Sequence, residues 1–418
     1  MNSQQAYIES ERCLQCFDAP CTEACPVHID IPKFIGMIRS GNIIGAAEVV
    51  KTSNALANTC GKICPEEVFC QSVCTRAKQD AALHIRELHF FATQSESAKG
   101  FSKTRLFPTI DGPVAVIGAG PAGLSSAFEL AKLGYKVDVF DKDGLGGVPR
   151  NSIPSFRLAD AELDSDTRFL SKYFRLKKED VNARTFEDIR HHYRAVFLGL
   201  GLGRDRHAGI PGERLKGVFP VLQFLHKGRS QPASLSIGNR VVIVGGGNVS
   251  LDAASTAKHL GAESVTLLYR RGEQEMRVWK GELREARRQG VELRFLTAPV
   301  AIVGTSEVTG VMCRQTRLSR ETDASGRRLP VEVKGSDFVI NADTVIIAIG
   351  QNIDAGWLDA FEKTEAGYLK VNKSFSTSVT GVFAGGDMIG GEGTIVQSIA
   401  QGKHAAHAIH EYLSKKQR

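Results

Sequence analysis

The sequence predicts an α/β protein in which a small α-helical domain precedes two domains of parallel strands and helices. Two observations predict this fold class. Eight of the nine cysteines lie between Cys13 and Cys74. Each of two later segments, 114–130 and 241–255, has the pattern of a strand, a glycine-rich turn and a helix. With 418 residues, 42% of them hydrophobic, the chain can bury several cores.

The composition argues against membrane, secretory and nucleic-acid-binding classes. No run of roughly 18 or more apolar residues occurs, and the N-terminus lacks the basic and apolar segments of a secretory signal. The net charge of +7 is modest, and Lys and Arg are spread along the chain, as is typical of a solvated surface. We expect a cytoplasmic protein that contacts neither a membrane nor a nucleic acid.

The cysteines form two groups, at 13–25 and 60–74, with spacings C-x2-C-x4-C-x3-C-P and C-x3-C-P-x4-C-x3-C. Without a secretory signal, such clustering points to metal ligation and not to disulfides. Structural zinc sites usually take two short Cys hairpins, whereas a run that ends in Cys-Pro is typical of bacterial ferredoxins. We therefore expect two 4Fe–4S clusters, with zinc as the alternative. Residues 30–56 have helical apolar spacing, so this first domain should be α-helical.

A dinucleotide fingerprint occupies the first strand–turn–helix segment. Its glycines have the G-x-G-x-x-G spacing, which permits a tight turn and lets a pyrophosphate approach the helix N-terminus. The candidate contacts of this turn are Gly118, Gly120, Pro121, Ala122 and Gly123. Asp141 ends the next strand, 23 residues after Gly118, where a carboxylate accepts hydrogen bonds from an adenosine ribose.

The second segment repeats this pattern, with Ser250 in the third glycine position. A serine is tolerable because only a small side chain is needed where the helix meets the strand. The candidate contacts are Gly245, Gly246, Gly247, Asn248 and Ser250. The next strand ends in Arg270 and Arg271 instead of an acid, 25 residues after Gly245. Arginines there suit the 2′-phosphate of NADP(H) and leave the ribose of NAD(H), the alternative, without its acceptor.

Two nucleotide folds in one chain, the first for FAD and the second for a nicotinamide, describe a flavin reductase. The apolar strand at 343–352 ends in a glycine turn at Gly350, as expected for the return to the first fold, and a later strand reaches Asp387. The expected fold is thus an N-terminal α-helical iron–sulfur domain followed by two Rossmann-like nucleotide-binding domains, with the NAD(P)H domain inserted into the FAD domain. The expected domain ranges are 1–105, 106–235, 236–345 and 346–418. A polar linker is expected over 94–112.

Several stretches together resemble one family over essentially the whole chain. They are the two cysteine groups, "NALANTCGKICP", "CTRAKQDAALHI", "GGVPRNSIPSFRL", "AVFLGLGL", "YRRGEQEMR" and "VFAGGD". In these the chain resembles the small subunit of bacterial dihydropyrimidine dehydrogenase and the N-terminal half of the fused animal enzyme. The small subunit of NADPH-dependent glutamate synthase is a more distant likeness.

The resemblance implies further nucleotide contacts. The positions that match the family's additional FAD contacts are Gly147, Val148, Arg157, Gly201, Asp387 and Thr394. Arg277 matches a further arginine that holds NADP(H) in such proteins. Because some bacterial small subunits of this kind use NADH, the nicotinamide nucleotide stays open.

The resemblance also implies that the two cysteine groups exchange cluster ligands. One cluster would take Cys13, Cys16, Cys21 and Cys74. The other would take Cys25, Cys64, Cys70 and His89, the last at a position where the family has Gln or Glu. The Cys-Pro signature after Cys25 points the same way, because in ferredoxins such a thiolate crosses to the neighbouring cluster. Cys60 matches a position that is not a ligand. The alternative is that Cys60 is the eighth ligand and His89 only packs beside Phe90.

The implied function is oxidation of NAD(P)H through FAD, with single electrons leaving through the clusters. Because the cofactors carry this chemistry, no catalytic side chain is expected. At 418 residues the chain has no room for the FMN barrel that reduces pyrimidines. Cys313, the only cysteine outside the metal domain, is expected to be a thiol on a strand and not a nucleophile.

An FMN-containing catalytic subunit is the expected partner, in a hetero-oligomer. A glutamate synthase large subunit is the second candidate. A redox-sensing interaction protein would be a different class of function, but the only tail that could signal, 414–418, is too short to favour it.

Overall fold

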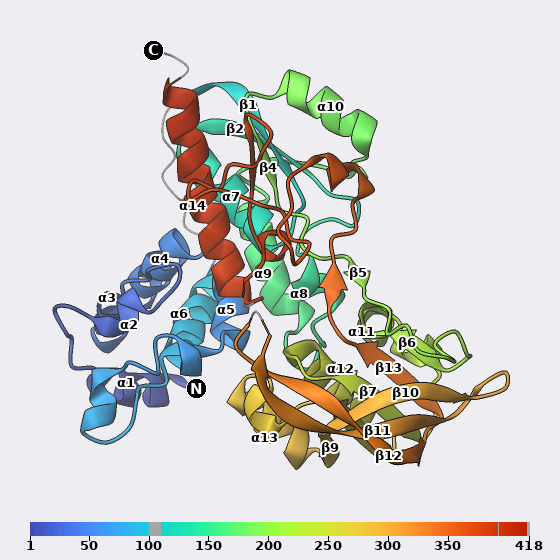
Figure 1. Ribbon diagram of the computed structural model, residues 1–418. Coiled ribbons are helices and arrows are strands. Elements are labelled where there is room, and N and C mark those ends of the chain that lie inside the picture. Colours follow the sequence, from blue (N-terminus) through green and yellow to red (C-terminus); the bar gives the residue numbers. More distant parts are fainter. Residues whose placement is uncertain (100–109, 324, 392, 416–418) are drawn as a thin grey trace. The chain divides into compact units, whose positions relative to one another are not determined.

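The computed structural model describes residues 1–99, 110–323, 325–391 and 393–415 (Figure 1). It divides into two compact units. The first contains residues 1–150, 155–202 and 353–418, and the second contains residues 151–154 and 203–352. The boundary expected between residues 105 and 106 and the end of the tail at 416–418 lie outside the described residues.

The N-terminal part of the first unit is α-helical, as the sequence predicts. Its helices are α1 (Ser3–Glu11), α2 (Pro20–Glu23), α3 (Ile31–Arg39), α4 (Ile43–Ser53), α5 (Ala57–Ile63) and α6 (Ile85–Lys99), with 3-10 turns η1 (Glu66–Val68) and η2 (Thr75–Lys78). Asn2, Asp30 and Asn42 cap α1, α3 and α4 by accepting hydrogen bonds from backbone N–H groups. The apolar faces meet in a core that includes Phe34 and Leu88.

The polar linker expected over residues 94–112 is wrong at both ends. Helix α6 continues to Lys99, and strand β1 begins at Ile110, while residues 100–109 lie outside the described ranges. The stretch that ends α6 is polar, but Gln, Glu, Ala and Lys are good helix formers. Polarity alone therefore did not mark the end of the helix.

The first unit contains a five-stranded parallel sheet in the order β15-β4-β1-β2-β3. The strands are β1 (Ile110–Ile117), β2 (Tyr135–Phe140), β3 (Arg175–Lys177), β4 (Val196–Leu198) and β15 (Val382–Ala384). The helices of this part are α7 (Pro121–Lys132), α8 (Val148–Asn151), α9 (Asp160–Leu170), α10 (Ala183–His192) and α14 (Ile395–Lys415), with η5 (Gly356–Ala360) and η6 (Asp387–Ile389). Helices α7 and α14 lie side by side (Figure 1). A Cβ added at Gly402 would lie only 2.1 Å from the carbonyl oxygen of Ala122, so this approach requires glycine.

The second unit contains another five-stranded parallel sheet, in the order β6-β13-β7-β8-β9. Its strands are β6 (Val218–Pro220), β7 (Arg240–Gly245), β8 (Ser264–Tyr269), β9 (Val291–Phe295) and β13 (Thr344–Ala348). Its helices are α11 (Val221–Ser230), α12 (Asn248–His259) and α13 (Lys280–Arg288), with η3 (Pro232–Ser234) and η4 (Glu273–Glu275). Because β6 pairs with β13, residues 218–230 fold with the second unit, although the sequence analysis groups them with the FAD-binding part.

Antiparallel strands complete the second unit. They are the three-stranded sheet β10 (Thr297–Gly304), β11 (Val308–Thr322) and β12 (Arg328–Asn341), and the pair β5 (Arg204–Asp205) and β14 (Gln351–Asn352). Cys313 lies fully buried in β11, as expected of a strand thiol. A helical domain followed by two parallel α/β sheets confirms the predicted fold class.

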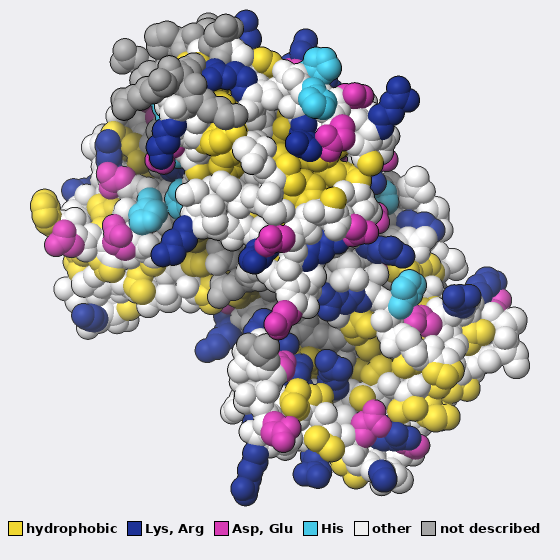
Figure 2. All heavy atoms as spheres, turned by 45° about the horizontal axis from the view of Figure 1, so that its top comes forward, with side chains coloured by type: hydrophobic (Ala, Val, Ile, Leu, Met, Phe, Trp, Pro, Cys, Tyr) yellow, Lys and Arg dark blue, Asp and Glu magenta, His cyan; other side chains and the backbone are white. Residues whose placement is uncertain are grey.

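The described surface matches the modest charge of the sequence. On the face shown in Figure 2, Lys and Arg side chains are scattered among acidic and apolar ones. None of the described helices combines the length and apolarity needed to cross a membrane.

Candidate functional site

The first glycine motif forms a tightly packed turn between β1 and α7. Gly118 has a φ of +101°, and a Cβ added there would lie 2.5 Å from the carbonyl oxygen of Gly199. A Cβ at Gly123 would lie 1.8 Å from the carbonyl oxygen of Gly118. In contrast, the closest atom to a Cβ at Gly120 would be 3.9 Å away. The turn is therefore closed on the protein side and open where a ligand would approach the N-terminus of α7.

Two loops of the same unit border this turn. The N–H of Gly146 donates to the carbonyl of Ala119 at 2.9 Å. A Cβ at Gly147 would lie 2.7 Å from the Cα of Gly120, so Val148 follows directly beside the motif. The loop after β4 carries Gly201, two residues after the close contact at Gly199. The structure thus brings together three segments that are far apart in the sequence.

Asp141 stands at the end of β2, as expected for a ribose-binding acid. Its carboxylate accepts hydrogen bonds from the backbone N–H groups of Ala119, Asp143 and Gly144, at 2.7, 2.8 and 2.9 Å. An ionised carboxylate has about four lone-pair sites. Asp141 therefore holds the glycine turn and retains capacity for one more donor, such as a ribose hydroxyl.

The C-terminal segment also reaches the first motif. A Cβ at Gly386 would lie 2.9 Å from the Cβ of Ala122, which places Asp387 beside the start of α7. Burial raises the pKa of Asp387, against a hydrogen bond from the Ser398 hydroxyl at 3.3 Å. Thr394 accepts a hydrogen bond from the backbone N–H of Gln397 and so caps α14.

Arg157 lies half-buried between α8 and α9 in the same unit. Taken together, the glycine cradle, the open helix N-terminus and Asp141 fit a dinucleotide such as FAD.

The second glycine motif has the same form. A Cβ at Gly246 would lie 2.2 Å from the ring of Tyr269, whereas nothing lies within 4 Å of a Cβ at Gly247. Ser250 is fully buried, and its hydroxyl donates to the carbonyl of Gly247 at 2.5 Å. A serine is therefore compatible with this position, because its buried hydroxyl is hydrogen-bonded to a carbonyl of the turn. Asn248 begins α12 and accepts a hydrogen bond from the backbone N–H of Trp279.

The three candidate arginines of the second unit have different environments. Arg270 and Arg277 are exposed. Arg271 has a side chain only 5% exposed, donates to Asp323 at 2.9 Å and donates to the carbonyl of Arg328 at 2.9 Å. The structure differs from the expectation here, because the Arg271 guanidinium is enclosed by the end of the β11–β12 hairpin.

Gly350 lies just after β13, with a φ of +115° and its carbonyl accepting a hydrogen bond from the N–H of Arg206.

The cysteine thiols of the helical domain are all free. Burial, with Cys74 and Cys13 beside it, raises the pKa of Cys21 to about 12. Burial also raises the pKa of the Cys13 thiol, and the nearby thiols of Cys16 and Cys74 add to this rise. Cys74 of the second sequence group thus lies among the thiols of the first group.

A second set of thiols contains Cys25 from the first sequence group. Burial raises the pKa of Cys64, with smaller contributions from Cys60, Cys70 and Cys25. Burial also raises the pKa of Cys70, where Cys25 is again a neighbour. The fold therefore interleaves the two sequence groups.

The donor chemistry of these thiols fits iron–sulfur clusters. As the side chains stand, no three or more His, Cys, Asp or Glu residues within the described ranges are arranged to hold a metal ion. A 4Fe–4S cluster takes its ligands on separate irons, so its thiolates surround a larger body than one ion. Eight free thiols in one helical domain provide ligands of the required kind.

His89 offers a further nitrogen donor. The side chain is 6% exposed, and its Nε2 is buried without a hydrogen-bond partner among the described residues. Burial lowers the pKa of His89 to about 4, against a hydrogen bond with the backbone of Ala57. Metal-ligating histidines commonly donate their other ring N–H to such a carbonyl. The unpaired Nε2 atom of His89 is therefore suited to bind iron. None of the described thiols contributes to the lowered pKa of His89.

Cys60, the competing ligand, is 2% exposed. Burial raises its pKa to about 12, the side chain of Asn54 opposes the rise, and nearby Asp166 adds to it. A neighbouring carboxylate disfavours a thiolate. Burial and the carboxylate of Glu66 raise the pKa values of the expected ligands Cys64 and Cys70 in the same way, so this environment does not distinguish Cys60 from them.

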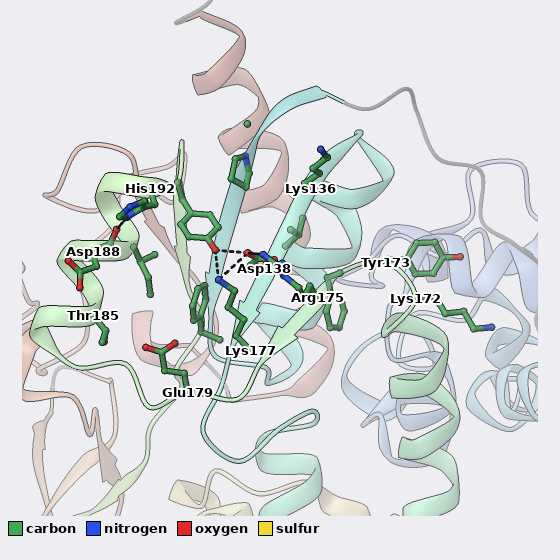
Figure 3. Close-up of a pocket in the computed structure, with 17 residues that line it drawn as sticks. Lys136, Asp138, Lys172, Tyr173, Arg175, Lys177, Glu179, Thr185, Asp188 and His192 are labelled. Carbon is green, nitrogen blue, oxygen red and sulfur yellow. Dashed lines mark hydrogen bonds and ion pairs between the residues drawn. The ribbon is translucent and has the colours of Figure 1, made fainter.

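A cavity of about 880 Å³ opens beside β2, β3 and α10 in the first unit (Figure 3). Within it, Asp138 accepts hydrogen bonds from Arg175, at 2.8 and 2.7 Å, and from the hydroxyl of Tyr193 at 2.5 Å. The ammonium of Lys177 lies 3.5 Å from the same carboxylate. None of the expected cofactor contacts lines this cavity. We interpret the network as structural, because it fastens β3 to β2.

Sequence reasoning missed two residues that organise these sites, Asp166 and Asp323. Each accepts a hydrogen bond from a residue more than 45 positions away in the chain, Asp166 from Asn58 and Asp323 from Arg271. Neither belongs to a local motif, so no signal in a single sequence marks them.

Two family models match the chain. Residues 112–407 match the pyridine nucleotide–disulphide oxidoreductase family. Residues 1–101 match the dihydropyrimidine dehydrogenase domain II, 4Fe–4S cluster. These matches imply FAD and NAD(P) for the larger part and 4Fe–4S ligation for the smaller one.

Curated relatives match nearly the full chain. The NAD-dependent dihydropyrimidine dehydrogenase subunit PreT of Escherichia coli (strain K12) is 36% identical over 413 residues, 98% of this chain and 94% of its own. The glutamate synthase [NADPH] small chain of Halomonas elongata is 36% identical over 431 residues, 98% of this chain and 91% of its own. These matches confirm the resemblance to both kinds of subunit, but the glutamate synthase small chain is as similar to this chain as the dihydropyrimidine dehydrogenase subunit and not more distant.

Solved structures share the fold of the nucleotide-binding part. FprA from Mycobacterium tuberculosis superposes with a TM-score of 0.64 at 19% identity, over 74% of this chain and 86% of its own. T. acidophilum thioredoxin reductase gives 0.56 at 22% identity, over 73% and 99%. The protein is therefore a flavin- and NAD(P)-type oxidoreductase, a member of the pyridine nucleotide–disulphide oxidoreductase family with an N-terminal 4Fe–4S domain of the dihydropyrimidine dehydrogenase kind.

Proposed function

We propose that this chain is the electron-entry subunit of a dihydropyrimidine dehydrogenase. In this role it oxidises NAD(P)H at FAD and delivers single electrons, through two 4Fe–4S clusters, to an FMN-containing catalytic subunit. The observation that carries the proposal is the match to PreT over 98% of this chain, which includes both the thiol domain and the nucleotide folds. The bound cofactors supply the hydride and electron transfer.

The protein's own residues bind and orient these groups. For FAD the proposed contacts are Gly118, Gly120, Pro121, Ala122, Gly123, Asp141, Gly147, Val148, Arg157, Gly201, Asp387 and Thr394. The open N-terminus of α7 favours a pyrophosphate through its free N–H groups. The closed side of the glycine turn supports this proposal, because only the ligand side leaves room for a phosphate.

The two thiol sets would each hold one cluster. Cys74 would join Cys13, Cys16 and Cys21, while Cys25 would join Cys64 and Cys70, with His89 as the remaining ligand. The neighbour relations of the thiols support the exchange of Cys25 and Cys74 between the groups, while Cys60 also lies near Cys64 and Cys25.

A second candidate function is that of a glutamate synthase small subunit. The relative from Halomonas elongata favours it, with an identity equal to that of PreT and nearly the same coverage. Both relatives are named as parts of larger enzymes, which supports a hetero-oligomer in either case. The two functions share every residue proposed above and differ only in the partner.

The test separates the chain from its partner. The purified chain should contain about eight irons and reduce an artificial one-electron acceptor with NADPH or NADH, but leave uracil unchanged. Adding an FMN-containing pyrimidine subunit from the same organism should start NAD(P)H-dependent uracil reduction. If a glutamate synthase large subunit instead yields glutamate from glutamine and 2-oxoglutarate, the second function holds. Uracil reduction by the single chain would contradict the proposal.

A further inference from the structure

Ion pairs join the loop after β8 to the end of the β11–β12 hairpin. Arg271 pairs with Asp323 at 2.9 Å and donates through Nε to the carbonyl of Arg328. Arg328 in turn pairs with Glu275 at 2.5 Å. Because its side chain is only 5% exposed, Arg271 cannot present a free face to a ligand in solution. Its contacts instead hold the hairpin against the loop.

The same hairpin meets the border of the second glycine motif. Gly247 forms a parallel bridge with Arg277, so this arginine stands beside the open part of the turn. The guanidinium of Arg277 donates to the carbonyl of Ser325 at 3.4 Å. Arg327 donates through Nε to the hydroxyl of Ser325 at 2.9 Å. Two guanidinium groups, one from the loop and one from the hairpin, therefore meet at one residue.

Positive charge exceeds negative charge at this place. Four arginines share partners here, namely Arg271, Arg277, Arg327 and Arg328, and the exposed Arg270 directly precedes Arg271 in the chain. The carboxylates that pair with them are Asp323 and Glu275. Within the described part of the chain, Arg270 has no ion-pair partner. Arg327 is 29% exposed and uses only part of its five N–H donors on Asp323 and Ser325. Such a surplus of guanidinium groups favours an anionic ligand.

The ligand follows from the place of the cluster in the fold. In a nucleotide fold of this kind, the end of the second strand of the motif, here β8, meets the adenosine ribose. A phosphate on the ribose 2′-hydroxyl would therefore reach the exposed cations of this cluster.

We propose that Arg327 is a specificity-determining residue that binds the 2′-phosphate of NADP(H) together with Arg270 and Arg277. Arg271 is then a positioning residue, which places the hairpin and does not touch the nucleotide. This inference rests on the proposed function, because it takes the second glycine motif as the nicotinamide nucleotide site. It goes beyond that function by assigning nucleotide choice to the hairpin.

The test compares two nucleotides that differ only in the 2′-phosphate. Binding of NADP+ and NAD+ to the full-length, cofactor-loaded protein is measured by calorimetry, for wild type and for Arg327→Ala. Loss of a charge-assisted contact should weaken NADP+ binding roughly tenfold or more and leave NAD+ within about twofold. Arg314→Ala is the matched control. Arg314 lies on β11 of the same hairpin and pairs with Glu332 and Asp337, so both affinities should stay unchanged.

The outcomes separate this inference from the proposed function. Unchanged NADP+ affinity in Arg327→Ala overturns the inference, and so does an equal loss for both nucleotides, which marks a structural role. A wild-type protein that binds NAD+ as tightly as NADP+ also overturns it, while NADH oxidation would leave the proposed function standing. A wild-type protein that binds neither nucleotide contradicts the proposed function itself.

Discussion

At the scale of single residues, two buried side chains compete for the eighth ligand position. Cys60 has the expected donor atom, but Asp166 lies close and the side chain of Asn54 hydrogen-bonds it. His89 has a buried nitrogen without a partner, while its ring also faces the backbone of Ala57. An unsatisfied buried polar atom costs roughly 1–3 kcal/mol, so a ligand at Nε2 would remove a real penalty.

We expect His89→Ala to alter or lose one cluster and Cys60→Ser to keep both. Electron paramagnetic resonance and iron analysis would show the loss as a fall from about eight irons per chain toward about four. His84→Ala is the control, because His84 is exposed and lies just before the same helix, α6. The reverse pattern, with iron lost only from Cys60→Ser, would return the eighth position to Cys60.

Residue roles differ in how far the sequence predicts them. The placement of Gly118, Gly123 and Asp141 follows from local spacing, because a turn and its next strand are set within about 25 residues. The burial of Arg271 cannot be predicted from local spacing. Arg270, its neighbour in the sequence, is exposed, whereas Arg271 is buried and forms an ion pair with Asp323, 52 residues away. Local pattern cannot tell two adjacent arginines apart when a distant carboxylate decides between them.

At the scale of secondary structure elements, the short strand β3 is held in its sheet by side-chain contacts as well as by backbone pairing. It has three residues at the edge of the first sheet, and two of them, Arg175 and Lys177, reach Asp138 on β2. Burial alone raises the pKa of Asp138, but hydrogen bonds from Arg175 and Tyr193 outweigh it, so the pKa lies below its usual value. A carboxyl with a lowered folded-state pKa stabilises the fold above its unfolded pKa of about 3.9. That contribution is lost as pH falls through the lower, folded pKa.

We expect Asp138→Asn to lower the melting temperature at pH 7, by a loss of about 1–3 kcal/mol from the broken network. The gap to wild type should stay constant from pH 7 to about 5 and narrow below about 4, where the carboxyl of the unfolded chain begins to gain its proton. Melting followed by circular dichroism across this range measures it. Asp188→Asn, an exposed acid of the same cavity, should change little. A gap that persists undiminished at pH 3 would contradict the assigned role of the charge.

Elements with a strong local pattern were predictable, and elements defined by distant pairing were not. The segments 114–130 and 241–255 form β1–α7 and β7–α12 as expected, since each contains its own turn chemistry. Strand β6 has only three residues, and its place is set by pairing with β13, more than 120 residues later. Periodicity within a window cannot assign such a strand to a sheet.

At the scale of the whole molecule, the thiol domain and the flavin fold belong to one compact unit. Helix α5 carries Cys60, is followed directly by Cys64 and has no side-chain cap from its own N-cap residue. Asp166 of α9 takes that role. It accepts hydrogen bonds from the backbone N–H groups of Asn58 and Thr59, at 3.0 and 2.8 Å, and from the Thr59 hydroxyl at 2.8 Å.

A second contact of this kind comes from α14. Its Lys403 donates to the carbonyl of Val27 at 3.4 Å and lies near Cys25. Helices of the flavin fold therefore reach thiol-bearing segments of the helical domain at two places.

Asp166→Ala tests whether this contact holds the thiol helix in position. The change leaves the buried N–H groups of Asn58 and Thr59 without an acceptor, and each such loss costs roughly 1–3 kcal/mol. We therefore expect a lower melting temperature and loss of iron from the thiol set that includes Cys64. FAD should stay bound, because Asp166 does not contact the glycine motif. Ser165→Ala is the control, since the Ser165 hydroxyl accepts a hydrogen bond from the side-chain amide of Asn58, and this variant should keep its iron. Flavin absorbance and iron per chain decide the result. Loss of FAD together with iron would mean that Asp166 supports the whole unit and not the thiol helix alone.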